Sequence, residues 1–230
     1  MKEFLTNSVF FGAVISFLGY EVGLILKKRL KLAIFNPLLI AVICVMGVLV
    51  IFDVDYDSYN EGGKYISYLL TPATVCLAVP LYEQLGLLKR NFKAVAAGIL
   101  SGTLASMFSV FLLSLLFGFS HEQYVTLLPK SITTAIGMGV SEELGGIVTI
   151  TVAVIVITGV LGAILAELVF RLFRIQEPVA RGLALGTSAH AIGTSKAMEL
   201  GMVEGAMSSL AIAVAGLLTV VGASFFAELL

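Results

Sequence analysis

The chain has 230 residues and a formal net charge of −1, with 59% hydrophobic and only 13% charged residues. Soluble domains carry about 25% charged residues, and so few polar groups could not cover a soluble surface, so a soluble fold is excluded. No basic cluster is large enough to bind nucleic acid. Several apolar runs reach the 20 or so residues that a spanning helix needs. We therefore expect an all-α, polytopic membrane protein.

Four apolar runs occupy the first half of the chain, at residues 6–26, 33–52, 65–88 and 94–119. The second opens at Asn36-Pro37, where a proline near a helix start needs no hydrogen-bond donor. The third is interrupted by Pro72 and Pro80. Basic residues follow the first and third runs, whereas an acidic loop at residues 53–61 follows the second. Because basic residues near spans favour the cytoplasm, we expect the basic loops inside and the acidic loop outside.

The second half contains two smooth apolar runs, 147–170 and 202–230, and two runs interrupted by glycine, proline and charged residues, 124–146 and 175–200. If every run crosses once, there are eight spans, and Arg171, Arg174 and Arg181 lie outside, against the charge rule. If the interrupted runs enter and return, there are six spans and two re-entrant hairpins, one from each face. We favour the second topology, in a single domain over residues 1–230.

An internal repeat supports broken helices in both halves. LLTPATVCLAVPLYEQLG (69–86) resembles LLPKSITTAIGMGVSEELGG (127–146), since both place proline early and close with an acidic residue before Leu-Gly. Repeats of interrupted helices, inverted in many transporters, point to a binding site near the bilayer midplane. The match is short, and it suggests inverted repeats without establishing them.

The stretch GTSAHAIGTSK (186–196) gathers hydroxyls, an imidazole and an ammonium in an apolar chain. Broken backbone in a membrane is tolerated only inside protein or beside a wet cavity, and the free N–H groups of half-helices attract anions. These hydrogen-bond donors and positive groups suit the binding of a small carboxylate. The substrate-binding residues that we expect are Thr74, Lys130, Ser131, Thr133, Thr134, Gly186, Thr187, Ser188, His190, Gly193, Thr194, Ser195 and Lys196.

Several of these residues also have a purely structural interpretation. The small residues would let helices pack closely, with hydroxyls bonded to the preceding turn. Lys196 would snorkel to the inner surface and Lys130 would reach outer water. Ionisable groups within spans are nevertheless functional hypotheses, and the candidates for proton coupling are His190, Glu21 and Glu167. Two open alternatives are that a neighbour satisfies a buried His190 and that Glu167 pairs with Arg171 one turn away.

The sequence argues against an enzyme. Ser188 and His190 lack an orienting acid and an oxyanion hole, and residues two apart on a helix do not face each other. There is no Cys/His cluster for a metal and no Walker-type phosphate loop. We expect neither a metal nor a cofactor.

Six segments carry a resemblance to a known family: FNPLLIA (35–41), YDSYNEGG (56–63), PATVCLAVPLYEQ (72–84), LLPKSITTAIGMGVSEELGG (127–146), ARGLALGTSAHAIGTSKAMELG (180–201) and EGAMSSLA (204–211). Over nearly its whole length the chain resembles the LrgB/CidB family of bacterial inner-membrane proteins. The resemblance implies a multi-pass protein of that membrane, working with a small LrgA/CidA-like membrane partner, and we also expect a homo-oligomer.

The resemblance implies two functions. One is a holin/antiholin-like control of murein hydrolase export and cell lysis. The other is transport of small monocarboxylates such as pyruvate, lactate, glycolate or glycerate. The broken polar segments fit this function, and we expect the transport to be proton-coupled. A third alternative is a purely structural subunit of a two-protein complex. The polar segments favour the carrier, because a lesion-forming protein needs no preorganised polar site at the midplane.

Overall fold

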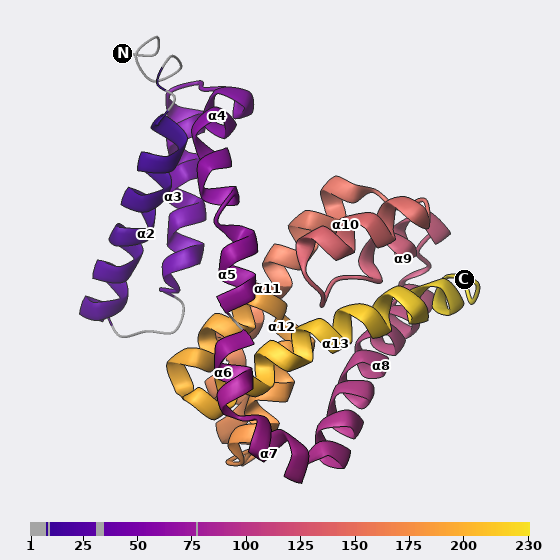
Figure 1. Cartoon of the computed structure of the whole chain (residues 1–230). Coiled ribbons are helices and arrows are strands. Elements are labelled where there is room, and N and C mark those ends of the chain that lie inside the picture. The colour runs from indigo at the N-terminus through magenta and orange to yellow at the C-terminus, as the bar shows by residue number, and fades with distance from the viewer. Residues whose placement is uncertain (1–7, 9, 31–34, 77) are drawn as a thin grey trace. The chain divides into compact units, whose positions relative to one another are not determined.

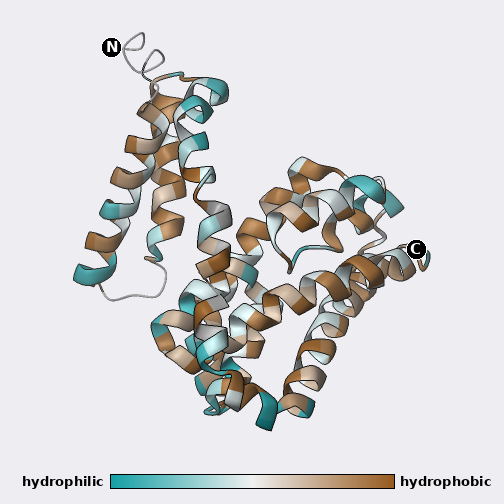
Figure 2. Cartoon of the chain, viewed as in Figure 1, coloured by the Kyte–Doolittle hydropathy of each residue, from teal (hydrophilic) through white to brown (hydrophobic). Residues whose placement is uncertain are grey.

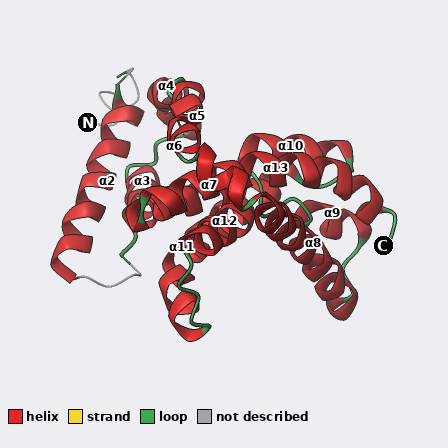
Figure 3. Ribbon diagram, turned by 60° about the horizontal axis from the view of Figure 1, so that its bottom comes forward, coloured by secondary structure: helices red, strands yellow, loops and turns green. Residues whose placement is uncertain are grey.

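The computed structural model describes residues 8, 10–30, 35–76 and 78–230, without the side chains of residues 70, 71, 74, 78, 80 and 81. In this part of the chain every regular element is a helix and there is no strand (Figure 3). Three of its helices are long and apolar enough to cross a membrane, α8 (Phe92–Phe117), α11 (Val148–Leu172) and α13 (Met202–Ala227). Hydrophobic residues dominate their ribbons (Figure 2). The predicted all-α, polytopic membrane fold is confirmed.

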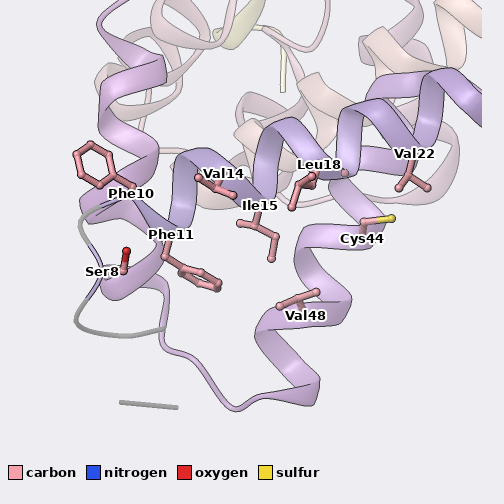
Figure 4. Close-up of a pocket in the computed structure, with 10 residues that line it drawn as sticks. Ser8, Phe10, Phe11, Val14, Ile15, Leu18, Val22, Cys44 and Val48 are labelled. Carbon is pink, nitrogen blue, oxygen red and sulfur yellow. The ribbon is translucent and has the colours of Figure 1, made fainter. Parts of the chain in front are cut away.

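The chain forms two compact units, Met1–Cys76 and Leu77–Leu230, and a single domain over residues 1–230 stays a prediction. In the first unit, α2 (Phe11–Leu30) packs against α3 (Pro37–Ile51) and α4 (Tyr56–Ser67), and α5 (Leu70–Cys76) follows (Figure 1). Asn36 caps α3 by accepting the N–H of Leu38 at 2.9 Å, and Pro37 stands in the first turn, as expected. An apolar groove of about 550 Å³ lies between α2 and α3, lined by side chains such as Ile15 and Val48 (Figure 4).

Two parts of the first half differ from expectation. The acidic stretch at residues 53–61 is helical from Tyr56 onward, because the Asp55 carboxylate accepts the N–H of Ser58 at 2.9 Å and so caps α4. The run at residues 65–88 is not one span but the end of α4 followed by α5, α6 (Ala78–Glu83) and α7 (Leu85–Arg90). A proline lacks the N–H that would bond four residues back, so Pro72 favours the interruption between α4 and α5. The position at which Pro80 was expected to interrupt the run, residue 77, lies outside the described residues.

In the second unit, the segment between α8 and α11 forms a helical hairpin. It consists of α9 (His121–Leu127), a turn, and α10 (Thr134–Glu143). The residue before α11 returns to the last turn of α9, because the N–H of Ile147 donates to Thr126 Oγ1 at 2.8 Å. Its turn reaches the middle of α8, where Ser106 Oγ donates to Ser131 Oγ at 2.9 Å. The segment therefore turns back on itself, as expected of a re-entrant hairpin.

A second hairpin is formed by α12 (Pro178–Leu200), which is broken at His190. The φ and ψ of His190, 41° and −133°, are not helical. A Cβ built on Gly193 would stand 2.5 Å from the carbonyl oxygen of Leu185, whereas residues eight apart in a straight helix are separated by about 12 Å. The two halves, residues 178–189 and 191–200, therefore lie side by side.

The α12 hairpin returns to the side from which it starts. Its tip lies against the middle of α11, where His190 meets Gly159, and its second half runs beside α11 to an ion pair between Lys196 and Glu167. The first half begins only six residues after α11 ends, so both ends of the hairpin lie near the same end of α11. These contacts agree with two re-entrant hairpins and oppose the topology of eight crossings. An inverted repeat relating the two halves stays a prediction.

Close helix packing holds the α12 hairpin against α13. A Cβ on Gly186 would stand 2.5 Å from the carbonyl oxygen of Ser208 and 2.6 Å from Cβ of Ala211. The hydroxyls of Thr194, in the other half, and Ser208 lie 2.7 Å apart and are hydrogen-bonded. Both halves thus contact the same turn of α13, which only a residue without a side chain permits at Gly186.

We expect Gly186→Ala to lower stability by about 1–3 kcal/mol, because the added methyl overpacks a contact between two backbones. Gly139→Ala is the matched control, since a Cβ on this helical glycine meets nothing within 4 Å and alanine is the better helix former. The measurement is thermal unfolding in detergent, followed by fluorescence-detected size exclusion. Equal melting temperatures for Gly186→Ala and wild type would contradict the packing described.

The hairpin topology predicts which sites share a side of the membrane. In a Cys44→Ser, Cys76→Ser background, we expect a membrane-impermeant maleimide to label Arg174→Cys and Met202→Cys from one side, because the α12 hairpin returns. His121→Cys should be labelled only from the opposite side, since one crossing of α11 separates the hairpins. Labelling of Arg174→Cys and Met202→Cys from opposite sides would show a full crossing instead.

Candidate functional site

A groove of about 840 Å³ lies between α8, the turn of the α9–α10 hairpin and the first half of α12. The first half of α12 runs parallel to α8, because Gly98 meets Leu183 and Gly102 meets Thr187 one turn later. Both broken segments therefore contribute to one cavity beside a spanning helix. The polar residues at its centre are Ser101, Ser106, Ser109, Lys130, Ser131, Thr187 and Ser188.

Lys130 and two serines form the most polar part of the groove. The Lys130 ammonium donates to Ser131 Oγ at 3.0 Å and to Ser106 Oγ at 3.4 Å. Ser106 in turn donates to Ser131 at 2.9 Å, and Ser131 is buried with 5% of its surface exposed. Since Ser106 lies near the centre of α8, this cluster lies at about mid-membrane depth.

The charge in the groove is unbalanced around Lys130. No carboxylate among the described residues forms an ion pair with it. The other charged residue of the lining, Glu177, precedes α12. Glu177 lies ten residues, or about 15 Å of helix, from Thr187. The centre of the groove therefore offers a single positive charge surrounded by neutral hydroxyls, which suits one anionic group.

The first half of α12 presents Thr187 and Ser188 to the groove. Their hydroxyls donate to the carbonyls of Leu183 at 2.9 Å and Ala184 at 2.6 Å, one turn back. Each hydroxyl oxygen keeps a lone pair, so in this geometry both can accept a hydrogen bond from a ligand hydroxyl. Of the predicted binding residues, Lys130, Ser131, Thr187 and Ser188 are brought together here.

Other predicted residues lie outside the groove lining. Thr133 and Thr134 begin α10 without a side-chain cap hydrogen bond. Gly186, Gly193 and Thr194 pack the α12 hairpin internally and against α13. Ser195 is exposed and donates to the carbonyl of Ala191 at 3.3 Å. The structural interpretation from the sequence fits the packing of the glycines and Thr194; the side chain of Thr74 lies outside the described residues.

The ionisable residues proposed for coupling are also outside the groove. His190 is 3% exposed, and its Nε2 donates to the carbonyl oxygen of Ile155 at 2.9 Å. Lys196 pairs with Glu167 and, at 3.3 Å, with Glu199. The alternative in which a neighbour satisfies His190 therefore matches the structure. Glu21 is exposed on α2, in the first unit.

The sequence reasoning missed the serines of α8. Ser101, Ser106 and Ser109 line the groove together with Gly98, Gly102 and Ala105. Spacings of three and four residues place these small and hydroxyl-bearing side chains along one face of an otherwise apolar span. That pattern was visible in the sequence, but it is also typical of plain helix packing.

Comparisons with known proteins agree on one family. The LrgB-like family matches residues 16–229 of this chain. Antiholin-like protein LrgB from Bacillus cereus (strain B4264) is 37% identical over 217 residues, which cover 94% of each chain. The protein of the same name from Bacillus anthracis (strain CDC 684 / NRRL 3495) has the same identity and coverage. No solved structure matches the chain.

The backbone of His190 yields a test of the hairpin tip. A positive φ costs a residue with a Cβ about 1–2 kcal/mol, and glycine avoids that cost. His190→Ala and His190→Gly both lose the bond to Ile155, so we expect His190→Gly to be the more stable variant by this amount. In an ordinary helix glycine is about 1 kcal/mol worse than alanine. Thermal unfolding of both variants measures this difference in stability. A higher melting temperature for His190→Ala than for His190→Gly would contradict the non-helical backbone at His190.

Proposed function

Because the chain belongs to the LrgB-like family, we propose that it carries small monocarboxylates across the bacterial inner membrane, working with a small LrgA/CidA-like partner. The proposed substrates are pyruvate, lactate, glycolate and glycerate. The observation that supports this function is the cluster of Lys130, Ser106 and Ser131 in a groove to which both hairpins contribute. The function is a binding and translocation activity without bond chemistry.

The charge of the cluster fits one carboxylate. An ammonium–carboxylate hydrogen bond is about twice as strong as a neutral one. The hydroxyls of Ser106 and Ser131 can hydrogen-bond the second oxygen of the carboxylate and so orient it. The remaining hydroxyls, on Thr187 and Ser188, can accept a hydrogen bond from a hydroxyl group of the same small acid. A second carboxylate would meet no second cation in the centre of the groove, so dicarboxylates are disfavoured.

The architecture provides a route for alternating access. The groove is bounded by one rigid span, α8, and by two hairpins that carry the polar residues. In many secondary carriers, substrate lies between discontinuous helices at the midplane and one bundle moves against another. Here a displacement of the α12 hairpin relative to α8 would open or close the groove around Lys130 and Thr187.

The second candidate is an antiholin-like regulator of murein hydrolase export and lysis, and it is favoured by the printed name of the curated relatives. The two candidates differ in what crosses the membrane. A carrier passes substrate saturably and keeps larger solutes out, whereas a lesion-forming protein releases both. Adding the small partner protein tests whether either activity needs it.

Purified protein in liposomes should take up radiolabelled pyruvate or glycolate saturably and retain an entrapped dye too large for a carrier. Lys130→Met should reduce uptake at low substrate at least tenfold, because it removes the cation, and Ser131→Ala by about fivefold, as expected for one lost hydrogen bond. Ser195→Ala is the matched control, since Ser195 is exposed and lies outside the groove. Dye release, or uptake unaffected by Lys130→Met, would count against the carrier.

A further inference from the structure

The groove holds an ammonium that pairs with no carboxylate of the described residues. Lys130 is partly buried, its Nζ is bonded only to the hydroxyls of Ser106 and Ser131, and no described carboxylate pairs with it. A charged side chain in the membrane interior costs several kcal/mol unless it is paired or hydrated. The charge of Lys130 is therefore least well compensated when the groove is empty.

Substrate binding stabilises the charged form of Lys130. A carboxylate beside Lys130 favours the ammonium, because opposite charges within about 4–6 Å stabilise each other's charged form. The two serine hydroxyls serve both states, since a hydroxyl accepts from an ammonium and donates to an amine. A site that gains one anion and one proton together keeps its net charge unchanged.

We propose that Lys130 carries the coupled proton, so that each monocarboxylate anion crosses together with one proton in an electroneutral symport. This inference rests on the proposed function and assigns its coupling residue. The proton passes from bulk water to Nζ of Lys130 as the anion binds, and both leave on the other side. No bond of the substrate breaks.

The groups proposed from the sequence for coupling are less suited to it. His190 donates its Nε2 proton to Ile155 and packs against Gly159, outside the groove lining. Glu167 already pairs with Lys196. Glu21 belongs to the other compact unit. None of the three lines the groove that contains Lys130, so substrate binding there would not directly change their charge.

Few other titratable groups face Lys130 from the elements around it. Residues 94–117 of α8 and 148–166 of α11 contain no ionisable side chain. In α9, Tyr124 bonds the carbonyl of Phe226, and in α10 Glu142 and Glu143 stand at the end away from the turn. The first half of α12 contributes Arg181, which donates to the carbonyl of Ile175, and Glu177 precedes it. Lys130 is thus the ionisable side chain at the centre of the groove.

The test is uphill uptake of radiolabelled pyruvate into liposomes driven by a pH gradient, with the membrane potential clamped by potassium and valinomycin. Wild type should reach an accumulation ratio that rises about tenfold per pH unit and does not change with membrane potential. Lys130→Arg keeps a cation that cannot lose its proton in a protein. We expect this variant to retain pyruvate exchange but to lose accumulation, with a ratio near one. His190→Asn should accumulate like wild type.

A second measurement does not depend on the folding of any variant. Calorimetric titration of wild type with pyruvate, in two buffers of different ionisation enthalpy, should show about one proton taken up per pyruvate bound at neutral pH. No proton uptake, or a Lys130→Arg variant that still accumulates tenfold per pH unit, overturns the assignment of Lys130 while leaving the carrier intact. Absence of saturable uptake by wild type overturns the proposed function and this inference together.

Discussion

Backbone N–H and C=O groups inside a bilayer have no water to bond with, and this constraint governs the second half of the molecule. Two segments leave the helical conformation at membrane depth, around residues 128–133 and at His190. Such breaks are tolerated only inside protein or beside a wet cavity. The α12 hairpin is enclosed by α11 and α13 at close range, which is why small residues such as Gly159 and Gly186 stand at the contacts. Tight packing of small residues is thus the condition for having a broken polar segment at all.

The same constraint explains where the polar side chains are used. All four hydroxyls of the α12 hairpin donate to the preceding turn, and that of Thr194 also bonds Ser208 of α13, so they stabilise the hairpin. The hydroxyl oxygens of Thr187 and Ser188 and the ammonium of Lys130 line the groove beside α8, where a ligand can reach them. Lys130 is distinctive there, because no described carboxylate pairs with it, and its charge can then be compensated by a species that binds and dissociates. In the proposed carrier, the substrate and the proton are the two species that would do this.

The sequence by itself determined the class of the protein and the position of its irregular segments. An apolar composition, long hydrophobic runs and clusters of glycine and proline are local properties, so the all-α membrane fold, the helix start at Asn36-Pro37 and the broken segment around His190 could be read without coordinates. The helical conformation of residues 56–61 was missed, because the cap by Asp55 depends on one side-chain hydrogen bond. Lys130, Ser131, Thr187 and Ser188 were identified because hydroxyls and a cation are rare in such runs.

Only the tertiary structure decided which of these polar groups share a cavity. The side of a helix that a hydroxyl occupies is set by packing partners far away in the chain, and these leave no local signal. Packing turned Gly186 and Thr194 toward α13, joined Lys196 to Glu167, and buried His190 against Ile155. It also brought Ser106 of α8 to Lys130, across 24 residues of sequence. The chemistry of the groove depends on that juxtaposition, because a single cation recognises a carboxylate only where the hydroxyls around it lie within hydrogen-bonding distance.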